Sequence, residues 1–288
     1  MKRIGLIGQR LKHSISVAFQ QAALDHHGLD IRYEIWDTQA SELEERMEAL
    51  RREDCLGANV TIPFKEAVIP YLDELDEGAH RIGAVNTIVR QGERLLGYNT
   101  DRVGFARSLE EAGFAARGAQ AAVLGAGGAG RAVAVALIEA QAGTIFVADV
   151  IPRRADSLAG DLKRLTRSGT TITWCYWGDG AFLRALADCR LLVNCTPVGM
   201  MHSETEGQSP IAADLIPSDC LAFDLVYNPP ETPFLAAARS RGARTMSGLR
   251  MLVHQGAASF RLWTGLEPPV ALMLEAAERA LTSPAAEV

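Results

Sequence analysis

Four glycines that follow a short apolar run have the spacing of a pyrophosphate-binding turn. The stretch from Ala121 to Leu137 reads AAVLGAGGAGRAVAVAL and contains the pattern Gly125-x-Gly127-x-x-Gly130. The apolar run predicts a buried parallel strand, and the apolar residues after the glycines recur at helical spacing. In such a turn one glycine adopts positive φ, one lets the backbone approach a pyrophosphate, and one lets the helix pack closely on the strand. The phosphates then bind the free N–H groups of the helix. An ordinary glycine-rich turn is the alternative interpretation.

A carboxylate follows at the distance that a ribose-binding residue needs. The next predicted strand, residues 144–147, ends in Ala148-Asp149, roughly 20 residues beyond the glycines. A carboxylate at this position accepts hydrogen bonds from the ribose hydroxyls of NAD. The pattern therefore predicts a dinucleotide site with a preference for NAD.

Three further groups of polar residues stand at the ends of predicted elements. Ser14 and Ser16 open a helix, where Ser16 is either an N-cap or part of a carboxylate site with Ser14. Lys65 follows a strand that stops at Pro63, and ligands of open α/β sheets bind at such carboxyl ends, although a single lysine is more often solvated surface. Asp101 precedes a predicted helix and is either its capping carboxylate or a functional group.

The elements that must position these residues fall into two groups. The first group is expected to contain strands, helices and a hairpin around Gln91-Gly92. The predicted strands are 3–8, 31–36 and a strand that begins near residue 56, the predicted helices are 41–52, 66–81 and one that opens at Ser14–Ser16, and the hairpin joins 84–89 to 94–98. After a helix over 103–112, strands alternate with helical stretches, which implies right-handed parallel crossovers and a doubly wound sheet. Those strands are predicted at 121–124, 144–147, 171–175, 191–194, 221–225 and 244–246.

We therefore predict an α/β fold with two domains separated by a cleft. Residues 1–101 plus 247–288 form a substrate-binding domain with a mainly parallel mixed sheet, to which the last helices, 249–264 and 269–281, return. Residues 102–246 form a Rossmann-type dinucleotide-binding domain. The only low-complexity segment is the tail, 283–288.

The composition excludes several classes of protein. With 48% hydrophobic and 22% charged residues the chain is neither disordered nor fibrous, and a net charge of −6 gives no basic surface for nucleic acid. Its five cysteines are odd in number and lack C-x-x-C spacing, so we expect neither a disulfide framework nor a metal site. No apolar run approaches ~18 residues, so no signal peptide or membrane span is expected, and the protein is predicted to be cytoplasmic.

Eight motifs, taken in order, carry a family resemblance. They are Ser14-x-Ser16, Asn59 to Lys65 (NVTIPFK), Gly83 to Thr87 (GAVNT), Asn99-Thr100-Asp101, Gly125 to Gly130, Asn194 to Met200 (NCTPVGM), Asp224 to Pro229 (DLVYNP) and Gly248-x-x-Met251-Leu252-x-x-Gln255. Together they closely resemble the shikimate dehydrogenase family, which includes the quinate/shikimate dehydrogenases. The resemblance covers nearly the whole chain.

The resemblance implies the roles of individual residues. Shikimate would lie in the cleft with its carboxylate on Ser14 and Ser16, and Lys65 and Asp101 would form the catalytic pair. The ring hydroxyls would be reached by Thr61, Lys65, Asn86, Asp101, Tyr227 and Gln255. The cofactor would be bound by Gly125, Ala126, Gly127, Gly128, Ala129, Gly130, Asp149, Arg154, Thr196, Pro197, Val198, Val226, Gly248 and Met251.

The implied chemistry explains these residue types. When a nicotinamide oxidises a secondary alcohol, a group within hydrogen-bond reach must accept the proton that leaves the oxygen. In the reverse direction a protonated Lys65 can polarise the ketone, and Asp101 can hold both a substrate hydroxyl and the ammonium. The sequence leaves open whether Lys65 transfers the proton or mainly orients and stabilises.

One departure from the family pattern bears on the cofactor. NADP-dependent members usually carry Asn-Arg-Thr after the second strand of the nucleotide domain, whereas this chain has Asp149, Val150 and Ile151. A carboxylate repels a 2′-phosphate, so we expect NAD to be preferred and NADP to bind more weakly, with help from Arg153 or Arg154. The departure resembles the NAD-using quinate/shikimate branch, as does the ending of residues 261–268.

Other positions resemble ordinary shikimate enzymes or depart from the family in small ways. Ser16 and Thr61 are those of ordinary shikimate enzymes. Val17 and Gln20 replace a proline and a histidine that are frequent in the family, and are expected to alter only the start of the helix.

The expected function is the NAD-preferring interconversion of shikimate and 3-dehydroshikimate, by a monomer or homodimer of the shikimate pathway of aromatic amino acid biosynthesis. The main rival is a quinate/shikimate dehydrogenase that also oxidises quinate, whose extra hydroxyl must fit near Ser14, Ser16 and Tyr227. A non-catalytic dinucleotide-binding sensor is the alternative of another class, and the presence of both Lys65 and Asp101 argues against it. A folate-linked dehydrogenase is disfavoured because the pairs Ser14/Ser16 and Asn86/Asp101 match a small polyhydroxylated acid.

Overall fold

The protein consists of two compact α/β units. The structure is a computed structural model that describes residues 1–11, 14–166 and 169–282. Unit 1 comprises Met1–Gly104 and Val253–Val288, and unit 2 comprises Phe105–Leu252. Each unit contains a six-stranded sheet, as the predicted fold class requires. The predicted loop residues 12–13 and the low-complexity tail 283–288 lie outside the described residues.

The sheet of unit 1 is mixed and has the strand order β2-β1-β3-β5-β6-β4. β1 pairs in parallel with β2 and β3, whereas β5 pairs antiparallel with both β3 and β6. The strands are β1 (Lys2–Gly8), β2 (Ile31–Asp37), β3 (Cys55–Val60), β4 (Glu74–Leu75), β5 (Thr87–Gln91) and β6 (Arg94–Tyr98). The turn between β5 and β6 contains Gly92 with φ +64°, which confirms the predicted hairpin.

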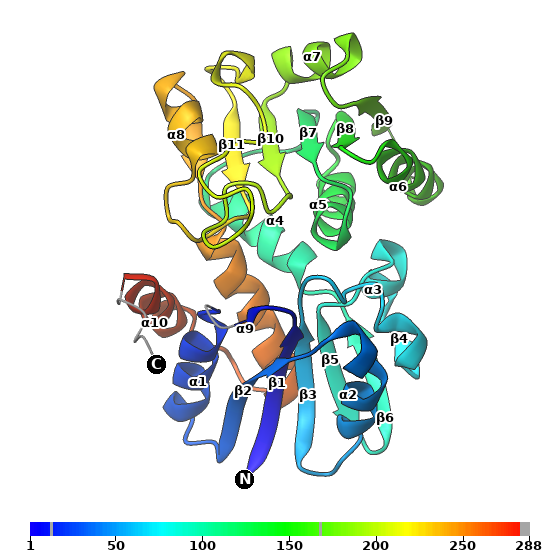
Figure 1. Cartoon of the computed structure of the whole chain (residues 1–288), viewed down its shortest axis with the longest axis vertical. Coiled ribbons are helices and arrows are strands. Elements are labelled where there is room, and N and C mark those ends of the chain that lie inside the picture. Colours follow the sequence, from blue (N-terminus) through cyan, green and yellow to red (C-terminus); the bar gives the residue numbers. More distant parts are fainter. Residues whose placement is uncertain (12–13, 167–168, 283–288) are drawn as a thin grey trace. The chain divides into compact units, whose positions relative to one another are not determined.

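Helices from both ends of the chain belong to unit 1. Figure 1 shows α10, in red, beside α1, in blue, although they lie at opposite ends of the sequence. The helices are α1 (Ser16–His26), α2 (Leu43–Ala49), α3 (Glu77–Ile82) and α10 (Val270–Thr282), with 3₁₀ turns η2 (Ala40–Glu42) and η3 (Ile69–Tyr71). Two more helices, α4 (Asp101–Glu111) and α9 (Leu249–Thr264), each contain a boundary between the units.

The single helix predicted over residues 66–81 is wrong. The segment instead forms the 3₁₀ turn η3, the short strand β4 and the helix α3. Pro70 has no N–H for a helical hydrogen bond, and the Asp76 carboxylate starts a new helix by accepting from the N–H groups of Gly78 (3.2 Å) and Ala79 (2.8 Å). The helix predicted over 41–52 is likewise shorter, because the observed α2 ends at Ala49.

Unit 2 has an entirely parallel sheet with the strand order β12-β11-β10-β7-β8-β9. This is the doubly wound order in which the first strand of the unit lies beside the fourth. The strands are β7 (Gln120–Leu124), β8 (Thr144–Asp149), β9 (Thr171–Tyr176), β10 (Leu191–Asn194), β11 (Leu221–Asp224) and β12 (Arg244–Met246). The connecting helices are α5 (Gly128–Glu139), α6 (Pro152–Leu165), α7 (Gly180–Ala187) and α8 (Pro233–Ser240), with a 3₁₀ turn η4 (Ala213–Leu215).

The turn between β7 and α5 depends on its glycines. Gly125 has φ +104°, a backbone conformation that residues with a side chain rarely adopt. A Cβ atom at Gly130 would lie 2.0 Å from the Gly125 carbonyl oxygen, so only glycine lets α5 start this close to the strand. Leu124 before the turn is fully buried, as are Val123 and Leu137 around it. Each large buried apolar side chain contributes roughly 1.5–3 kcal/mol to stability, so burial holds the turn in place at the sheet.

Candidate active site

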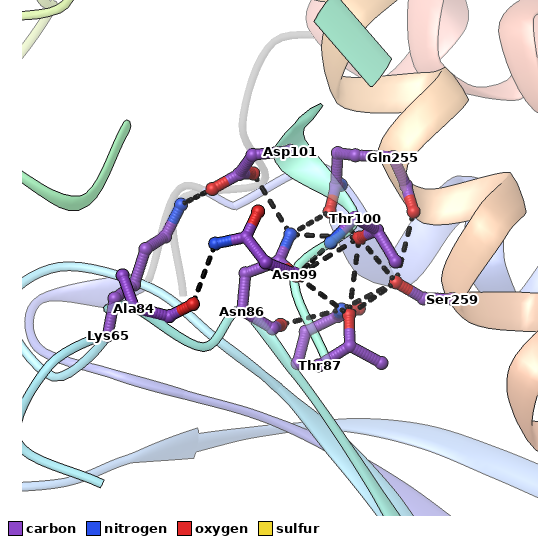
Figure 2. A network of polar contacts seen from close by, with 10 residues as sticks. Lys65, Ala84, Asn86, Thr87, Asn99, Thr100, Asp101, Gln255 and Ser259 are labelled. Atoms are coloured by element: carbon purple, nitrogen blue, oxygen red, sulfur yellow. Dashed lines mark hydrogen bonds and ion pairs between the residues drawn. The ribbon is translucent and has the colours of Figure 1, made fainter. Parts of the chain in front are cut away.

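Lys65 and Asp101 form an ion pair within unit 1. Lys65 lies in the turn that follows β3, Asp101 begins α4, and Lys65 Nζ is 2.5 Å from Asp101 Oδ2 (Figure 2). The two side chains are only 16% and 7% exposed, so water screens their attraction much less than that of a surface pair. The Asp101 carboxylate bonds side chains of other elements, Lys65 and Asn86, which a role as a helix cap alone would not require.

Asn86 fixes the other side of the Asp101 carboxylate. Its Nδ2 group donates to Asp101 Oδ1 at 2.9 Å and also lies 3.1 Å from Gln255 Oε1. Its Oδ1 atom accepts from the backbone N–H of Thr100 at 2.7 Å, and this contact fixes the orientation of the amide. The structure thus brings together four of the predicted site residues, Lys65, Asn86, Asp101 and Gln255, from four different segments of the chain.

A second group of polar residues supports these four and was missed at the sequence level. Thr87, Thr100 and Ser259 are buried, and their hydroxyls bond one another at 2.7 to 3.2 Å (Figure 2). Thr87 and Thr100 stand inside predicted motifs, so they could have been included. Ser259 follows Gln255 by four residues on α9, a spacing that places both side chains on one helix face.

Asn59 and Tyr33 extend this group into the core of unit 1. Asn59 Nδ2 lies 3.0 Å from Ser259 Oγ and 3.1 Å from Thr87 Oγ1, and Asn59 Oδ1 accepts from the Tyr33 hydroxyl at 2.8 Å. Burial raises the pKa of Tyr33, so its hydroxyl stays a donor. Because almost every polar atom of this network has a partner, the network is rigid and can hold the Lys65–Asp101 pair in one geometry.

Ser14, Ser16 and Thr61 lie outside the network. Ile15, not Ser16, occupies the N-cap position of α1, so the capping alternative for Ser16 is wrong; instead Ser14 Oγ accepts from the Ser16 N–H at 3.3 Å. Thr61 packs its methyl group against the backbone of Gly8, where an added Cβ would be 2.5 Å away. In the described part of unit 1, none of these three residues hydrogen-bonds to the Lys65 network.

Gln20 has a different role from the one expected. It is buried, and its Nε2 donates to the carbonyl oxygen of Gly256 at 2.9 Å. A Cβ at Gly256 would be 2.5 Å from the ring of Phe19, so the glycine lets α1 and α9 approach closely. Gln20 therefore supports α9 next to Gln255 rather than altering the start of α1.

The turn in unit 2 fits a dinucleotide phosphate. Gly127 is the N-cap of α5, no side chain caps the helix there, and an added Cβ would meet nothing within 4 Å. The first N–H groups of α5, including those of Gly128, Ala129 and Gly130, thus lack the side-chain cap that would compete with an anion. The turn and the helix start meet the requirements for holding a pyrophosphate.

The Asp149 carboxylate is hydrogen-bonded to the backbone of this turn. Its Oδ2 accepts from the backbone N–H of Ala126 and its Oδ1 from that of Ile151, each at 2.8 Å, and the residue is only 7% exposed. An ionised carboxylate can accept about four hydrogen bonds, so two positions remain for ribose hydroxyls. Val150 follows with 75% of its surface exposed, and Arg154 lies exposed on α6.

The remaining predicted cofactor residues lie at the carboxyl ends of β10, β11 and β12 or on α9. Asn194 Oδ1 accepts from the N–H and the hydroxyl of Thr196, and Asn194 Nδ2 donates to Asp224 Oδ1 at 2.9 Å. Asp224 also accepts from the Val226 N–H at 3.0 Å, and burial raises the pKa of Asp224 to about 6. Of the other predicted cofactor residues, Pro197 and Val198 follow Thr196, Gly248 follows β12, and Met251 is buried on α9. Tyr227, a predicted substrate-binding residue, follows β11 in unit 2.

Within the described ranges, no three His, Cys, Asp or Glu side chains gather as they would around a metal ion. None of the helices that the structure describes is long and apolar enough to cross a membrane.

Comparisons with known proteins identify the family of the chain. The family model described as "Shikimate dehydrogenase substrate binding domain" matches residues 6–88, and the one described as "Shikimate 5'-dehydrogenase C-terminal domain" matches residues 248–278. The chain is 46% identical over 271 residues to the shikimate dehydrogenase (NADP(+)) of Moorella thermoacetica, covering 94% of this chain and 90% of that one.

Solved structures give the same result over nearly the full length. A shikimate 5-dehydrogenase from Thermus thermophilus, crystallised with NADP(H) and shikimate, is 42% identical with a TM-score of 0.86 and covers 98% of this chain and all of that one. A quinate dehydrogenase from Corynebacterium glutamicum, in complex with NAD, is 35% identical with a TM-score of 0.84 over 96% and 98% of the two chains. The chain therefore belongs to the shikimate dehydrogenase family and is a nicotinamide-dependent oxidoreductase acting on a CH–OH group.

Proposed function

We propose that this protein is a shikimate dehydrogenase that interconverts shikimate and 3-dehydroshikimate and prefers NAD as its cofactor. The observation that carries the proposal is the buried Lys65–Asp101 ion pair, whose carboxylate is also held by Asn86. A surface lysine would not need such a setting, and a protein that only binds dinucleotides would not need the pair.

Lys65 and Asp101 act together on the reacting oxygen. A lysine ammonium has three N–H donors, and Asp101 takes only one of them, so another can bond the carbonyl oxygen of the ketone. In reduction this bond polarises the carbonyl and delivers the proton, and in oxidation the pair receives the proton from the hydroxyl. Asn86 holds the second carboxylate oxygen, so that Oδ2 keeps facing the ammonium. The nicotinamide, when bound, supplies the hydride exchange at carbon.

The substrate is expected to be a small acid with several hydroxyls. Ser14 and Ser16 lie at the start of α1, where hydroxyl donors and helix N–H groups favour a carboxylate. Thr61, Asn86 and Gln255 supply donors and acceptors for ring hydroxyls, and the role of Tyr227 stays a prediction. The relatives named above for shikimate support this choice.

The preference for NAD rests on Asp149 and Val150. A 2′-phosphate at Asp149 would place two negative charges side by side, and the exposed Val150 provides no cation to offset them. Relatives named for NADP(+) support the broader statement that a nicotinamide dinucleotide binds, and the choice between the two cofactors is proposed from these two residues. In this proposal unit 1 binds the substrate and unit 2 binds the cofactor.

Identifying the product tests this function. The purified protein is incubated with shikimate and NAD, and the product is identified by mass spectrometry and by the absorbance of reduced nicotinamide. We expect 3-dehydroshikimate, with much slower turnover of quinate. Comparable turnover of quinate would instead assign the protein to the quinate/shikimate branch, and binding of NAD without turnover of either acid would favour the sensor.

A further inference from the structure

Three exposed apolar residues stand at the carboxyl ends of the neighbouring strands β8 and β9. Val150 and Ile151, directly after β8, are 75% and 45% exposed, and Tyr176, the last residue of β9, is 54% exposed. We call these three residues the apolar shelf. Ligands of open α/β sheets bind beyond the carboxyl ends of the strands, so these side chains stand where a ligand is expected rather than at a random place on the surface.

The strand order places the shelf in line with the phosphate turn and Asp149. The glycine-rich turn follows β7, Asp149 ends β8, and Tyr176 ends β9, three strands that are neighbours in the sheet in this order. Tyr176 is the register partner of Asp149, so their side chains leave the same face of the sheet about 4.8 Å apart along the hydrogen-bonding direction. A nucleotide with its pyrophosphate on the turn and its ribose on Asp149 therefore points its base towards Tyr176.

The ring of Tyr176 is supported by a neighbouring aromatic side chain. Its ring meets that of Trp174 edge to face, with ring centroids 5.0 Å apart and an interplanar angle of 72°. Trp174 precedes it by two residues on the same face of β9, so one side of the Tyr176 ring is supported while about half of the residue stays exposed.

We propose that Tyr176 is the residue on which the adenine ring of the dinucleotide stacks, with Val150 and Ile151 beneath the adenosine. This inference rests on the proposed dinucleotide site and adds to it a residue that binds the base. A nucleobase presents a π face to an aromatic side chain, and such stacking makes a sizeable contribution to binding. The base is the same in NAD and NADP, so Tyr176 strengthens the binding of both cofactors equally. Asp149, in contrast, selects between them.

Binding measurements with cofactor fragments test the inference without relying on turnover. Isothermal titration calorimetry gives the Kd of ADP-ribose, NAD and NADP for the wild type, Tyr176→Ala, Tyr176→Phe and the control Leu183→Ala. Leu183 is also an exposed apolar residue of unit 2, 41% exposed on α7. We expect Tyr176→Ala to raise each Kd about tenfold. Tyr176→Phe, which keeps the ring, should restore binding, and Leu183→Ala should have no effect.

The ratio of the Kd values for NAD and NADP separates stacking from a distortion of the site. Stacking leaves this ratio unchanged in Tyr176→Ala, whereas damage to the neighbouring Asp149 would change it, and such a change would overturn the inference. An unchanged Kd for ADP-ribose in Tyr176→Ala would overturn the inference and leave the proposed function standing. A wild type that binds neither NAD nor NADP would overturn both.

Discussion

Lys65 Nζ and Asp101 Oδ2 lie 2.5 Å apart although 36 residues separate them in the chain. The contact depends on two elements of unit 1: the turn after β3 brings Lys65 to the carboxyl end of that strand, and α4 begins at Asp101. Asn86, at the start of the hairpin, joins them by holding the other carboxylate oxygen. The pair is therefore set by the sheet of unit 1 and not by a flexible surface contact.

Removing either partner of this pair should reduce turnover strongly. Lys65→Ala and Asp101→Asn are expected to lower kcat by about 10²–10⁴, because each loses a positioned group that donates or receives a proton. Steady-state kinetics in both directions measure this loss. Lys163→Ala, on the exposed surface of α6, serves as the matched control and should retain full activity. Retention of wild-type kcat in Lys65→Ala would contradict the assigned role.

Ser259→Ala should reduce stability and turnover by disrupting the hydrogen-bond network next to the Lys65–Asp101 pair. The hydroxyl contacts Asn59, Thr87 and Thr100, so its loss leaves buried polar atoms with fewer partners at a cost of about 1–3 kcal/mol. We expect a lower unfolding temperature and a reduced kcat with little change in cofactor binding. Ser240→Ala removes an exposed hydroxyl on α8 and is the control. If the two variants behaved alike, the network would not support the site.

The cofactor preference can be shifted at an exposed position. Val150→Arg places a cation beside Asp149 without touching the hydrogen bonds of that carboxylate to Ala126 and Ile151. We expect kcat/KM with NADP to rise by about tenfold relative to NAD, because the guanidinium pairs with the 2′-phosphate. Val150→Gln has a similar length without the charge and should leave the ratio nearly unchanged. An equal effect of both substitutions would exclude a charge-based explanation.

Asp224 should give unit 2 a pH-dependent stability. Burial raises its pKa from 3.8 to about 6, so the folded state holds this proton more tightly than the unfolded state does. The stabilising contribution is complete below pH 3.8 and is lost as the pH rises through about 6, a change of about 3 kcal/mol. Asp224→Asn removes this dependence and can keep the bonds from Asn194 and Val226 to Oδ1.

Urea unfolding at several pH values between 4 and 7 measures the effect. The wild type should lose stability relative to Asp224→Asn over this range. Asp73 should add no pH dependence in this range, because the hydrogen bond from Arg51 lowers its pKa and its contribution is lost only as the pH falls below 3.8. A constant difference between the wild type and Asp224→Asn from pH 4 to 7 would show that Asp224 titrates normally.

Much of the fold could be predicted from the sequence where local patterns are strong. The bounds of β10, β12 and α9 agree with the prediction to the residue, because clear periodicity and flanking breakers mark them. The segment 66–81 could not be predicted in this way. Its strand β4 exists because it pairs with β6, a tertiary contact that no local pattern contains.

The candidate site likewise contains residues that local motifs indicate and residues that depend on contacts distant in the sequence. The motifs indicated Lys65 and Asp101 as candidates, and the structure shows that they meet. Ser259 could not be identified from its own surroundings, because its partners Thr87 and Asn59 are 172 and 200 residues away in the chain. The bonds of Asp149 to the backbone of the turn were also outside the reach of the sequence, since backbone donors leave no pattern of residue types.

The most direct test of the account is the steady-state kcat/KM of the wild-type protein for shikimate with NAD and with NADP, measured side by side with quinate as the second substrate. The account predicts the highest value for shikimate with NAD, a clearly lower one with NADP, and little turnover of quinate. A clear preference for NADP would contradict the role given to Asp149 and Val150, and no turnover of shikimate with either cofactor would contradict the function assigned to Lys65 and Asp101.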